Sequence, residues 1–416
     1  MSQTADYDVL IIGAGMVGSS LACALGGSPL RVALVEAKAP PTSTQHGFDG
    51  RSLALSYGSR RIFQGLGLWQ SIRPEAEPIV RIHISDRGRF AAARLLASDH
   101  GVEALGYVAE IGALSAAVGR AARRHANVEL LCPAAMEAVT FHPDGVDVHI
   151  RAGEDLRTVR TRLVVAADGA DSGVRSHLGI NARRWDYGQS ALIANVEVSR
   201  PHGGTAYERF TDSGPMALLP LRGKDGLQRC ALVWTMAPAD AERALEWDEQ
   251  EFRNRLQERF GFRAGRFGRI GRRQAHPLFL VRAQQQVHER LALIGNAAHT
   301  LHPVAGQGFN LGLRDVAALA ELLVAAPDDT GAPAVLERYA AWRRSDQRTV
   351  IAFTDLLART FTNPLRPVQL ARDLALLAVD LLPPLKHQLE RRTMGLAGRL
   401  PRLARGLPLI AGEAER

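Results

Sequence analysis

The sequence predicts an α/β protein in which a mostly parallel sheet is joined by a second sheet and by helices at the carboxyl end. Three short apolar runs each lead into a glycine-rich turn, within residues 8–18, 163–175 and 290–315. Such runs are typical of strands buried on both faces of a parallel sheet. Alternating apolar and polar residues at 191–198 and 229–234 indicate strands of another sheet with one covered face. The patterns therefore predict two sheets of different kinds in one chain.

The predicted domains are discontinuous, because the three strand-and-turn segments must meet at one edge of the same sheet. The pieces of this first domain are 1–75, 105–180 and 288–325. The second sheet, which would cover the ligand and bind the substrate, is expected in 76–104 and 181–287. A helical C-terminal region is expected at 326–416.

The amino-terminal segment contains a dinucleotide-binding pattern. The apolar run Asp8–Ile12 precedes the turn GAGMVG, whose glycines are Gly13, Gly15 and Gly18. In a Rossmann-like fold, one such glycine turns the chain, one lets a pyrophosphate approach, and one lets the helix pack on the strand. Glu36 follows the next apolar run, where it could accept hydrogen bonds from both hydroxyls of an adenosine ribose and would repel a 2′-phosphate. The pattern predicts bound FAD or NAD rather than NADP.

The second apolar run, Leu163–Ala167, leads into Asp168 and Gly169. An aspartate at this place could simply cap the following turn or helix. Alternatively, it could face the same cofactor as the first glycine turn, because both turns follow strands of one sheet.

The third apolar run ends at Gly295 and opens into a loop that could hold a flat ring. Pro303, Gly306 and Gly308 disfavour ordinary helix, and the glycines let backbone approach a ligand without a Cβ in the way. Unpaired N–H groups at the start of the next helix would suit the C2 carbonyl and N1 of a reduced, anionic flavin. Taken alone, the segment is also compatible with a glycine-rich turn that holds no ligand.

The three motifs together resemble those of the FAD-dependent aromatic hydroxylases, the class A flavoprotein monooxygenases. The matching strings are GAGMVG with Glu36, AADGADSGVR at 166–175, and GNAAHTLHPVAGQGFNLGLRD at 295–315. Within this family, the chain most resembles the ubiquinone-biosynthesis hydroxylases, and among them those of 2-polyprenyl-6-methoxyphenol. Four further strings carry this closer resemblance, which covers nearly the whole chain: DGRSLALSYGSRRIFQGLGLW at 49–69, SDRGRF at 85–90, YERFTDSGPMALLPL at 207–221 and PPLKHQLERRTMG at 383–395.

The resemblance implies an FAD-dependent monooxygenase with NAD(P)H as a transient reductant and O2 as co-substrate. Through a flavin C4a-hydroperoxide, it would hydroxylate the ring of a polyprenyl phenol, taking 2-polyprenyl-6-methoxyphenol to the 1,4-benzoquinol on the route to ubiquinone. Two alternatives stay open. The enzyme could hydroxylate a soluble aromatic compound or another ring position of the ubiquinone precursor, or the chain could be a non-catalytic flavin-bearing subunit of a biosynthetic complex.

The resemblance also implies the cofactor contacts. Asn296 stands where the broader family usually has Asp, and its amide oxygen could still accept a hydrogen bond from the ribityl chain. Arg51 and Arg120 match arginines of the family near the cofactor, although each could instead be an ordinary surface guanidinium. The complete set of predicted cofactor residues is Gly13, Gly15, Gly18, Glu36, Arg51, Arg120, Asp168, Asn296, Gly308, Phe309 and Asn310.

The candidate catalytic residues are His299, His302 and Pro303, beside the predicted flavin loop. Either imidazole could relay a proton near neutral pH, although hydrogen bonding within the loop would explain each histidine as well. The pair has no third ligand at a sensible spacing, so we predict no metal site. The candidate substrate-pocket residues are Tyr207, Phe210, Leu218, Leu219 and Pro220, with Tyr57 and Tyr187 as further phenol-handling candidates.

Composition argues against several other classes of protein. The net charge of +8 comes without basic blocks interleaved with aromatics, so we expect no nucleic-acid partner. The three cysteines stand at no disulfide or metal spacing, which favours the cytoplasm. We recognise neither a signal peptide nor an uncharged run of membrane-spanning length.

The C-terminal region combines leucines with basic residues. Between Lys386 and Arg405, six Lys or Arg residues accompany one acid, Glu390. Packed helices with a solvated basic face would explain this composition. The alternative is attachment to an anionic membrane surface or to partner proteins. Because a polyprenyl phenol is a lipid, the resemblance favours peripheral contact with the inner membrane and with other ubiquinone-biosynthesis proteins.

Overall fold

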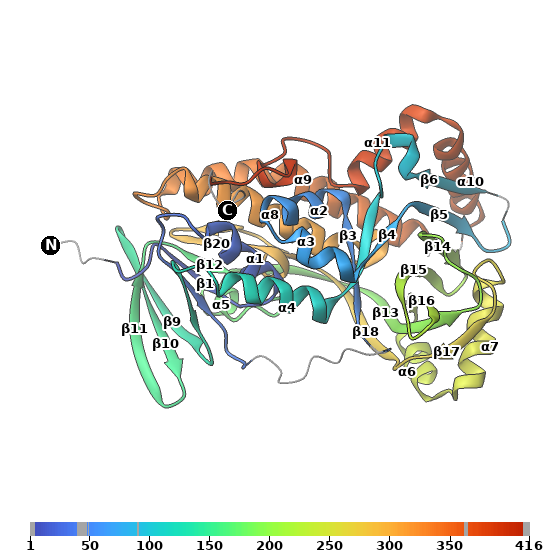
Figure 1. Ribbon diagram of the computed structural model, residues 1–416, viewed down its shortest axis with the longest axis horizontal. Helices are drawn as coiled ribbons and strands as arrows, with labels where there is room; N and C mark the ends of the chain where they lie inside the picture. Colours follow the sequence, from blue (N-terminus) through green and yellow to red (C-terminus); the bar gives the residue numbers. More distant parts are fainter. Residues whose placement is uncertain (1–4, 40–47, 49, 90, 362–364, 411–416) are drawn as a thin grey trace.

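The computed structural model describes residues 5–39, 48, 50–89, 91–361 and 365–410 (Figure 1). These residues form a six-stranded sheet, a nine-stranded sheet, two three-stranded sheets and a set of covering helices. The predicted α/β class with C-terminal helices is confirmed.

The six-stranded sheet carries the three glycine-rich turns. Its strands, in spatial order, are β19 (Val287–His288), β20 (Leu291–Leu293), β12 (Val164–Ala166), β1 (Val9–Ile12), β2 (Val32–Val35) and β8 (Val128–Leu131). Neighbouring strands are parallel except for β19 and β20. Ile12 lies beside Ala166, which lies beside Leu293, so β1, β12 and β20 end at one edge. The three turns therefore meet there.

Both faces of this sheet are covered, which explains why its strands are apolar throughout. Val9 and Ile11 pack towards helices α1 (Met16–Leu25), α4 (Ile111–Ala122) and α8 (Gln307–Val324). Leu10 and Ile12 pack on the opposite side, against an antiparallel sheet. The strands of that sheet are β9 (Ala135–His142), β10 (Gly145–Ala152) and β11 (Asp155–Thr161).

The nine-stranded sheet forms the other half of the molecule. Its strands, in spatial order, are β21 (His299–Thr300), β18 (Gln274–Ala283), β13 (Ala182–Val198), β16 (Leu227–Met236), β15 (Gly214–Lys224), β14 (Thr205–Thr211), β5 (Arg81–Asp86) and β6 (Ala92–Leu96), with β17 (Phe267–Ile270) paired to β13. Helices α6 (Pro238–Glu246) and α7 (Glu249–Phe260) pack on one face. The opposite face lines a cavity.

Two strands depart from the expected division of the chain. The predicted second-sheet range 76–104 includes β4 (Ala76–Ile79), which instead pairs with β7 (Gly106–Glu110) beside β3 (Ser52–Ser56). Conversely, β21 belongs to the predicted flavin loop but pairs with β18 of the nine-stranded sheet. Segments that connect one sheet to the other are thus themselves strands with hydrogen-bonded partners. Local sequence patterns do not identify those partners. The domain division stays a prediction.

The C-terminal helices follow α8 and flank the nine-stranded sheet. They are α9 (Pro333–Phe361), α10 (Arg366–Leu381) and α11 (Pro383–Thr393). The ion pairs Arg89–Asp373 (2.6 Å) and Arg94–Asp380 (2.7 Å) attach α10 to the sheet. The remaining helices and 3-10 turns are α2 (Tyr57–Gly65), α3 (Trp69–Ile72), α5 (Gly173–His177), η1 (Arg73–Glu75), η2 (Ala97–His100), η3 (Gly295–Ala297), η4 (Val304–Gly306) and η5 (Leu403–Arg405). Among the described residues, every helix is too short or too polar to cross a membrane.

Candidate active site

The three glycines of GAGMVG occupy three different environments. Gly13 has φ of 103°, and a Cβ there would lie 2.6 Å from the carbonyl oxygen of Ala167. A Cβ on Gly18 would overlap the carbonyl oxygen of Gly13, so this glycine lets α1 pack closely. A Cβ on Gly15 would meet no atom within 4 Å. The open space at Gly15 fits the approach of a pyrophosphate to the start of α1.

Glu36 lies beside this turn. Its Oε2 accepts a hydrogen bond of 2.9 Å from the backbone N–H of Ala14, and its Oε1 accepts one of 3.1 Å from that of Lys38. The side chain is half-buried and is held at the end of β2, next to β1. The structure therefore brings the predicted ribose-binding carboxylate to the glycine turn.

Asp168 lies on the other side of Gly13. Its Oδ2 accepts a hydrogen bond of 3.1 Å from the N–H of Val174, as the capping interpretation expects. Its Oδ1 is buried and has no hydrogen-bond partner within the described part of the chain. A buried acceptor without a donor destabilises a fold, and a bound cofactor could supply the donor. Both readings of this aspartate are thus compatible with the geometry.

The segment after β20 packs closely on the same edge. A Cβ on Gly312 would lie 3.0 Å from the Cα of Gly295, so α8 approaches the strand end without an intervening side chain. Asn296, the next residue, is exposed at this edge. Gly308, in the first turn of α8, has no atom within 4 Å of an ideal Cβ. Open space at both places fits a flat cofactor above the loop.

Asn310 and Phe309 have structural contacts of their own. The Asn310 amide oxygen accepts hydrogen bonds from the Ser56 N–H (2.8 Å) and the Ser59 hydroxyl (2.7 Å). Its amide nitrogen donates to two backbone carbonyls, those of Ala54 and Gly306. Phe309 stacks near Phe63, with ring centroids 6.4 Å apart. Asn310 therefore fixes the loop against β3, and its side chain has little capacity left for a cofactor.

Arg51 and Arg120 are both exposed. Arg51 directly precedes β3, and its backbone carbonyl accepts from the N–H of Ile111. Arg120 lies in the last turn of α4. The assignment of these two guanidinium groups to the cofactor stays a prediction.

His299 belongs to a buried polar network, so hydrogen bonding within the fold explains it, and its catalytic assignment stays a prediction. Its Nε2 lies 2.6 Å from Asp315 Oδ2, and Arg343 Nε donates to Asp315 Oδ1 at 2.7 Å. Burial alone would raise the pKa of Asp315, but His299 and Arg343 lower it well below its usual range. The network joins the loop to α8 and α9 and does not border the cavity.

His302 is also buried and is not among the residues that line the cavity, and its catalytic assignment stays a prediction. Its Nδ1 accepts a hydrogen bond of 3.1 Å from the N–H of Val304, and its ring meets the edge of Tyr187 at 5.0 Å. Burial lowers its pKa to about 4, so the ring is neutral and weakly basic at physiological pH. Tyr187 itself donates to Asp355. Of the predicted catalytic set, Pro303 alone lines the cavity.

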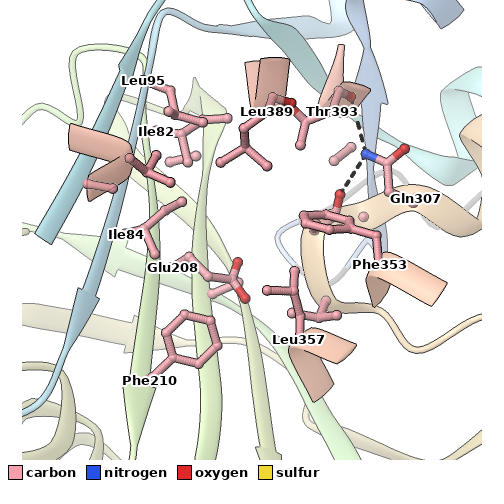
Figure 2. A pocket seen from close by; sticks show the side chains of 18 of the residues that line it. Ile82, Ile84, Leu95, Glu208, Phe210, Gln307, Phe353, Leu357, Leu389 and Thr393 are labelled. Atoms are coloured by element: carbon pink, nitrogen blue, oxygen red, sulfur yellow. Dashed lines mark hydrogen bonds between the residues drawn. The ribbon is translucent and has the colours of Figure 1, made fainter. Parts of the chain in front are cut away.

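A cavity of about 720 Å³ runs from the loop at 303–307 to helix α10 (Figure 2). Its volume is in the range of small-molecule sites. The lining is almost entirely apolar, and its larger side chains include Ile82, Ile84, Leu95, Phe210, Leu219, Phe353, Leu356, Leu357, Leu376 and Leu389. Such walls can hold an apolar molecule and keep water from the loop.

Three of the five predicted pocket residues line this cavity, namely Tyr207, Phe210 and Leu219. Leu218 and Pro220 are absent from the lining of this cavity. Leu218 packs on the opposite face of the sheet, in the core beneath α6 and α7. Successive side chains of a strand point to opposite faces, so Leu219 faces the cavity while Leu218 and Pro220 point away from it.

Sequence reasoning missed Glu208, which also lines the cavity. Among the described lining residues, Glu208 is the only acid and Arg372 the only base. Burial raises the pKa of Glu208 to about 8. An acid between Ala206 and Phe210 on an alternating strand was the available signal, because residues two apart share a face.

The fold and this site define an FAD-dependent aromatic-ring monooxygenase. A family model described as "FAD binding domain" matches residues 6–354. The chain is 41% identical over 413 residues to "Ubiquinone hydroxylase UbiL" of Rhodospirillum rubrum, covering 97% of this chain and 93% of that one. It is 33% identical over 396 residues to the 3-demethoxyubiquinol 3-hydroxylase of Escherichia coli, covering 94% and 98%. The chain belongs to this family of FAD-dependent hydroxylases.

Solved structures support the same fold. The p-nitrophenol 4-monooxygenase of Pseudomonas putida superimposes with a TM-score of 0.76 at 22% identity, covering 95% of this chain and 100% of that one. FAD, when bound, supplies the activation of O2 after reduction by NAD(P)H. The three turns would hold this cofactor, and the apolar walls of the cavity would keep water from a bound ring.

Proposed function

We propose that this protein hydroxylates the aromatic ring of a polyprenyl phenol in ubiquinone biosynthesis, taking 2-polyprenyl-6-methoxyphenol to the corresponding 1,4-benzoquinol. The observation that carries this proposal is the long apolar cavity that begins at the flavin loop. The names of the relatives support the same pathway. A ring bound near the loop leaves the rest of the cavity for an isoprenoid chain, since that part offers apolar contacts.

The charges of the cavity also favour a neutral, lipid-like substrate. An aromatic acid would need a cationic partner in such surroundings, because an unpaired buried charge is strongly disfavoured. Arg372, the base that lines the cavity, is already paired with Asp86 on β5. A carboxylate substrate would have to compete with this buried ion pair. A prenylated phenol would need no such partner.

The test compares 2-geranyl-6-methoxyphenol with 2-methoxyphenol, which lacks the prenyl chain. Because each buried methylene contributes about 0.8 kcal/mol, we expect the prenyl compound to have a KM at least about tenfold lower. NAD(P)H oxidation and the hydroxylated product would be measured together, with the product's ring position assigned by NMR. Equal KM values, or hydroxylation of soluble phenols alone, would contradict the proposal. Hydroxylation at another carbon would overturn the assigned step.

We also propose that the protein contacts an anionic bilayer through α10 and α11. We call the exposed leucines of α10, α11 and their flanking residues, together with Leu356 of the neighbouring α9, the leucine surface: Leu356, Leu365, Leu370, Leu374, Leu381, Leu382 and Leu385. It adjoins the cavity, since α10 also supplies Ala375 and Leu376 to the lining. A large exposed apolar patch on a soluble domain marks an interaction site. A lipid substrate could pass from the bilayer into the cavity at this place.

The charges around the leucine surface suit anionic lipid. The acids of α10 and α11 are withdrawn from solvent or paired: Asp373 with Arg89, Asp380 with Arg94, and Glu390 with His100. Arg391 and Arg392 remain exposed on α11. Exposed cations beside apolar side chains are typical of surfaces that attach to anionic membranes.

We expect the double variant Leu374→Ser/Leu381→Ser to lose at least about tenfold in binding to vesicles of phosphatidylglycerol and phosphatidylethanolamine, because it removes two apolar side chains from the contact. Cosedimentation would measure the bound fraction. Leu156→Ser is the matched control: Leu156 is 54% exposed and Leu374 55%, but Leu156 lies on β11 at the opposite end of the molecule (Figure 1). The proposal would be contradicted if wild-type protein does not bind these vesicles, or if both variants lose binding to the same extent.

A further inference from the structure

Glu208 stands alone as a polar group on one wall of the cavity. It lies on β14 between Ala206 and Phe210, which share its face of the sheet. Figure 2 shows its carboxyl pointing into the cavity, with Ile84 on one side and Leu357 of α9 across the space. The side chain therefore faces the place that a substrate would occupy.

The surrounding strands offer this carboxyl no partner. Its cross-strand neighbours are Ala217 on β15 and Ile84 on β5, and neither side chain can form a hydrogen bond. No hydrogen bond or ion pair joins Glu208 to another described residue. Arg372, the base of the cavity, is held by Asp86 and by the carbonyl of Thr360. Glu208 is half-buried, and its carboxyl faces the cavity, so a bound molecule could pair with it there and shield it from water.

Gln307 shows how the other polar groups of the cavity differ. Its amide nitrogen donates to the carbonyls of Ala305 and Thr393, at 3.1 and 3.2 Å (Figure 2). Asn310 is likewise committed to the loop and β3. Gln307 Oε1 has no partner within the described part of the chain, but the amide nitrogens of both side chains fix the walls in place, whereas Glu208 forms no such bond.

We propose that Glu208 is the group that orients the substrate ring, through a hydrogen bond from its carboxylic acid to an oxygen substituent of the phenol. The proposal deepens the proposed function and rests on it. Apolar walls hold a ring but do not fix its rotation, whereas one directed hydrogen bond does. With one substrate oxygen held by Glu208, the ring has a fixed rotation. The ring carbon that then faces the loop at 303–306 would be the one that is hydroxylated.

The charge state of Glu208 supports a donor rather than a carboxylate. Because burial raises its pKa to about 8, the neutral form predominates at physiological pH. The charged group that shares the cavity is Arg372 on α10, which is paired, while the ring of the neighbouring Tyr207 packs against Phe260 on the opposite face of the sheet. As pH rises through about 8, Glu208 loses its proton and can no longer donate. Binding of the phenol should weaken over that range.

The test uses FAD-loaded protein with Glu208→Gln and Glu208→Leu. Gln keeps a neutral donor of the same shape, and Leu keeps similar volume without one. Binding of 2-geranyl-6-methoxyphenol would be followed through the flavin absorbance, together with the ring position of the product and the fraction of NAD(P)H consumption that yields it. FAD content and Tm serve as folding controls.

We expect Glu208→Leu to raise the phenol Kd about tenfold, because a directed hydrogen bond in a buried site is lost. It should also produce a mixture of ring positions and consume NAD(P)H without product. Glu208→Gln should keep the wild-type product. The wild-type Kd should rise between pH 7 and 9, while that of Glu208→Gln stays constant.

Two results would overturn the inference. One is Glu208→Leu with wild-type affinity and a single product. The other is Glu208→Gln that binds normally but does not turn over, since this would make Glu208 a proton acceptor instead. Failure of the proposed function looks different: wild-type protein would reject the prenyl phenol, and the two variants could then be compared on 2-methoxyphenol.

Discussion

Gly15→Val is expected to yield a folded protein that holds no FAD. Gly15 is the N-cap of α1 in an extended conformation, with φ of −65° and ψ of 179°, which valine adopts without strain. No protein atom lies within 4 Å of an ideal Cβ, so the new side chain fills only the space left for a pyrophosphate. Because overlap of this kind costs at least about 1–3 kcal/mol, flavin content should fall to about a tenth of wild type or less.

Absorbance of bound flavin per chain measures this effect, with circular dichroism and Tm as tests of folding. Ala239→Val, on the exposed start of α6, adds bulk away from the site and should leave flavin content unchanged. Gly18→Val is a contrasting variant, because its side chain would overlap the Gly13 carbonyl and should prevent folding itself. If Gly15→Val is purified with wild-type flavin content, the cofactor does not lie against this glycine.

The cofactor end could be predicted from sequence because its requirements are local. A positive φ at Gly13 and a missing Cβ at Gly18 are demands on single backbone positions, and they leave a recognisable spacing. The apolar runs before the turns reflect strands covered on both faces. The resemblance to a known family then indicated that three turns far apart in the sequence form one site. The structure brings these turns to one edge of the sheet.

The sheets themselves were only partly predictable. The sheet of β9, β10 and β11 was not anticipated, because its strands are amphipathic and look like parts of a solvated surface. The pairing of β14 with β5 joins segments more than 100 residues apart, and it is parallel. Local patterns carry no information on such partners. The substrate cavity depends on this pairing, since both strands line it.

The catalytic and substrate residues could not be assigned from residue type alone. A histidine beside a flavin loop suggests proton transfer, but His299 is hydrogen-bonded to Asp315 on the next helix, α8. The sequence alone does not show that these two residues meet. Conversely, a glutamate on a strand suggests solvent, but Glu208 points into an apolar cavity. In both cases the role follows from what surrounds the side chain in space. Leu218 and Leu219 are the same residue type, and only the face of the strand on which each lies decides which one lines the cavity.

Asp315→Asn is expected to lower the free energy of unfolding by about 3–5 kcal/mol, because it breaks a buried ion pair and leaves the cation uncompensated. The Asp315 side chain is 0% exposed. It accepts from Arg343 at 2.7 Å and from Gln347 at 2.9 Å, besides its contact with His299. The variant should also loosen the loop that carries Pro303. Urea unfolding of FAD-loaded protein measures the difference.

The pH dependence of this difference follows from the lowered pKa of Asp315. A carboxyl whose pKa is lower in the folded state stabilises it fully above its unfolded pKa of about 4, and this contribution is lost as pH falls through the folded pKa. The gap between wild type and Asp315→Asn should therefore be constant from pH 7 to about 5 and shrink only in stronger acid. Asp212→Asn is the control: this carboxylate is 67% exposed and pairs with Arg259 and, at 3.4 Å, with Arg87 on the surface, so its loss should cost about 0–1 kcal/mol. Equal stability of the two variants would mean that the buried network does not hold the loop to α8 and α9.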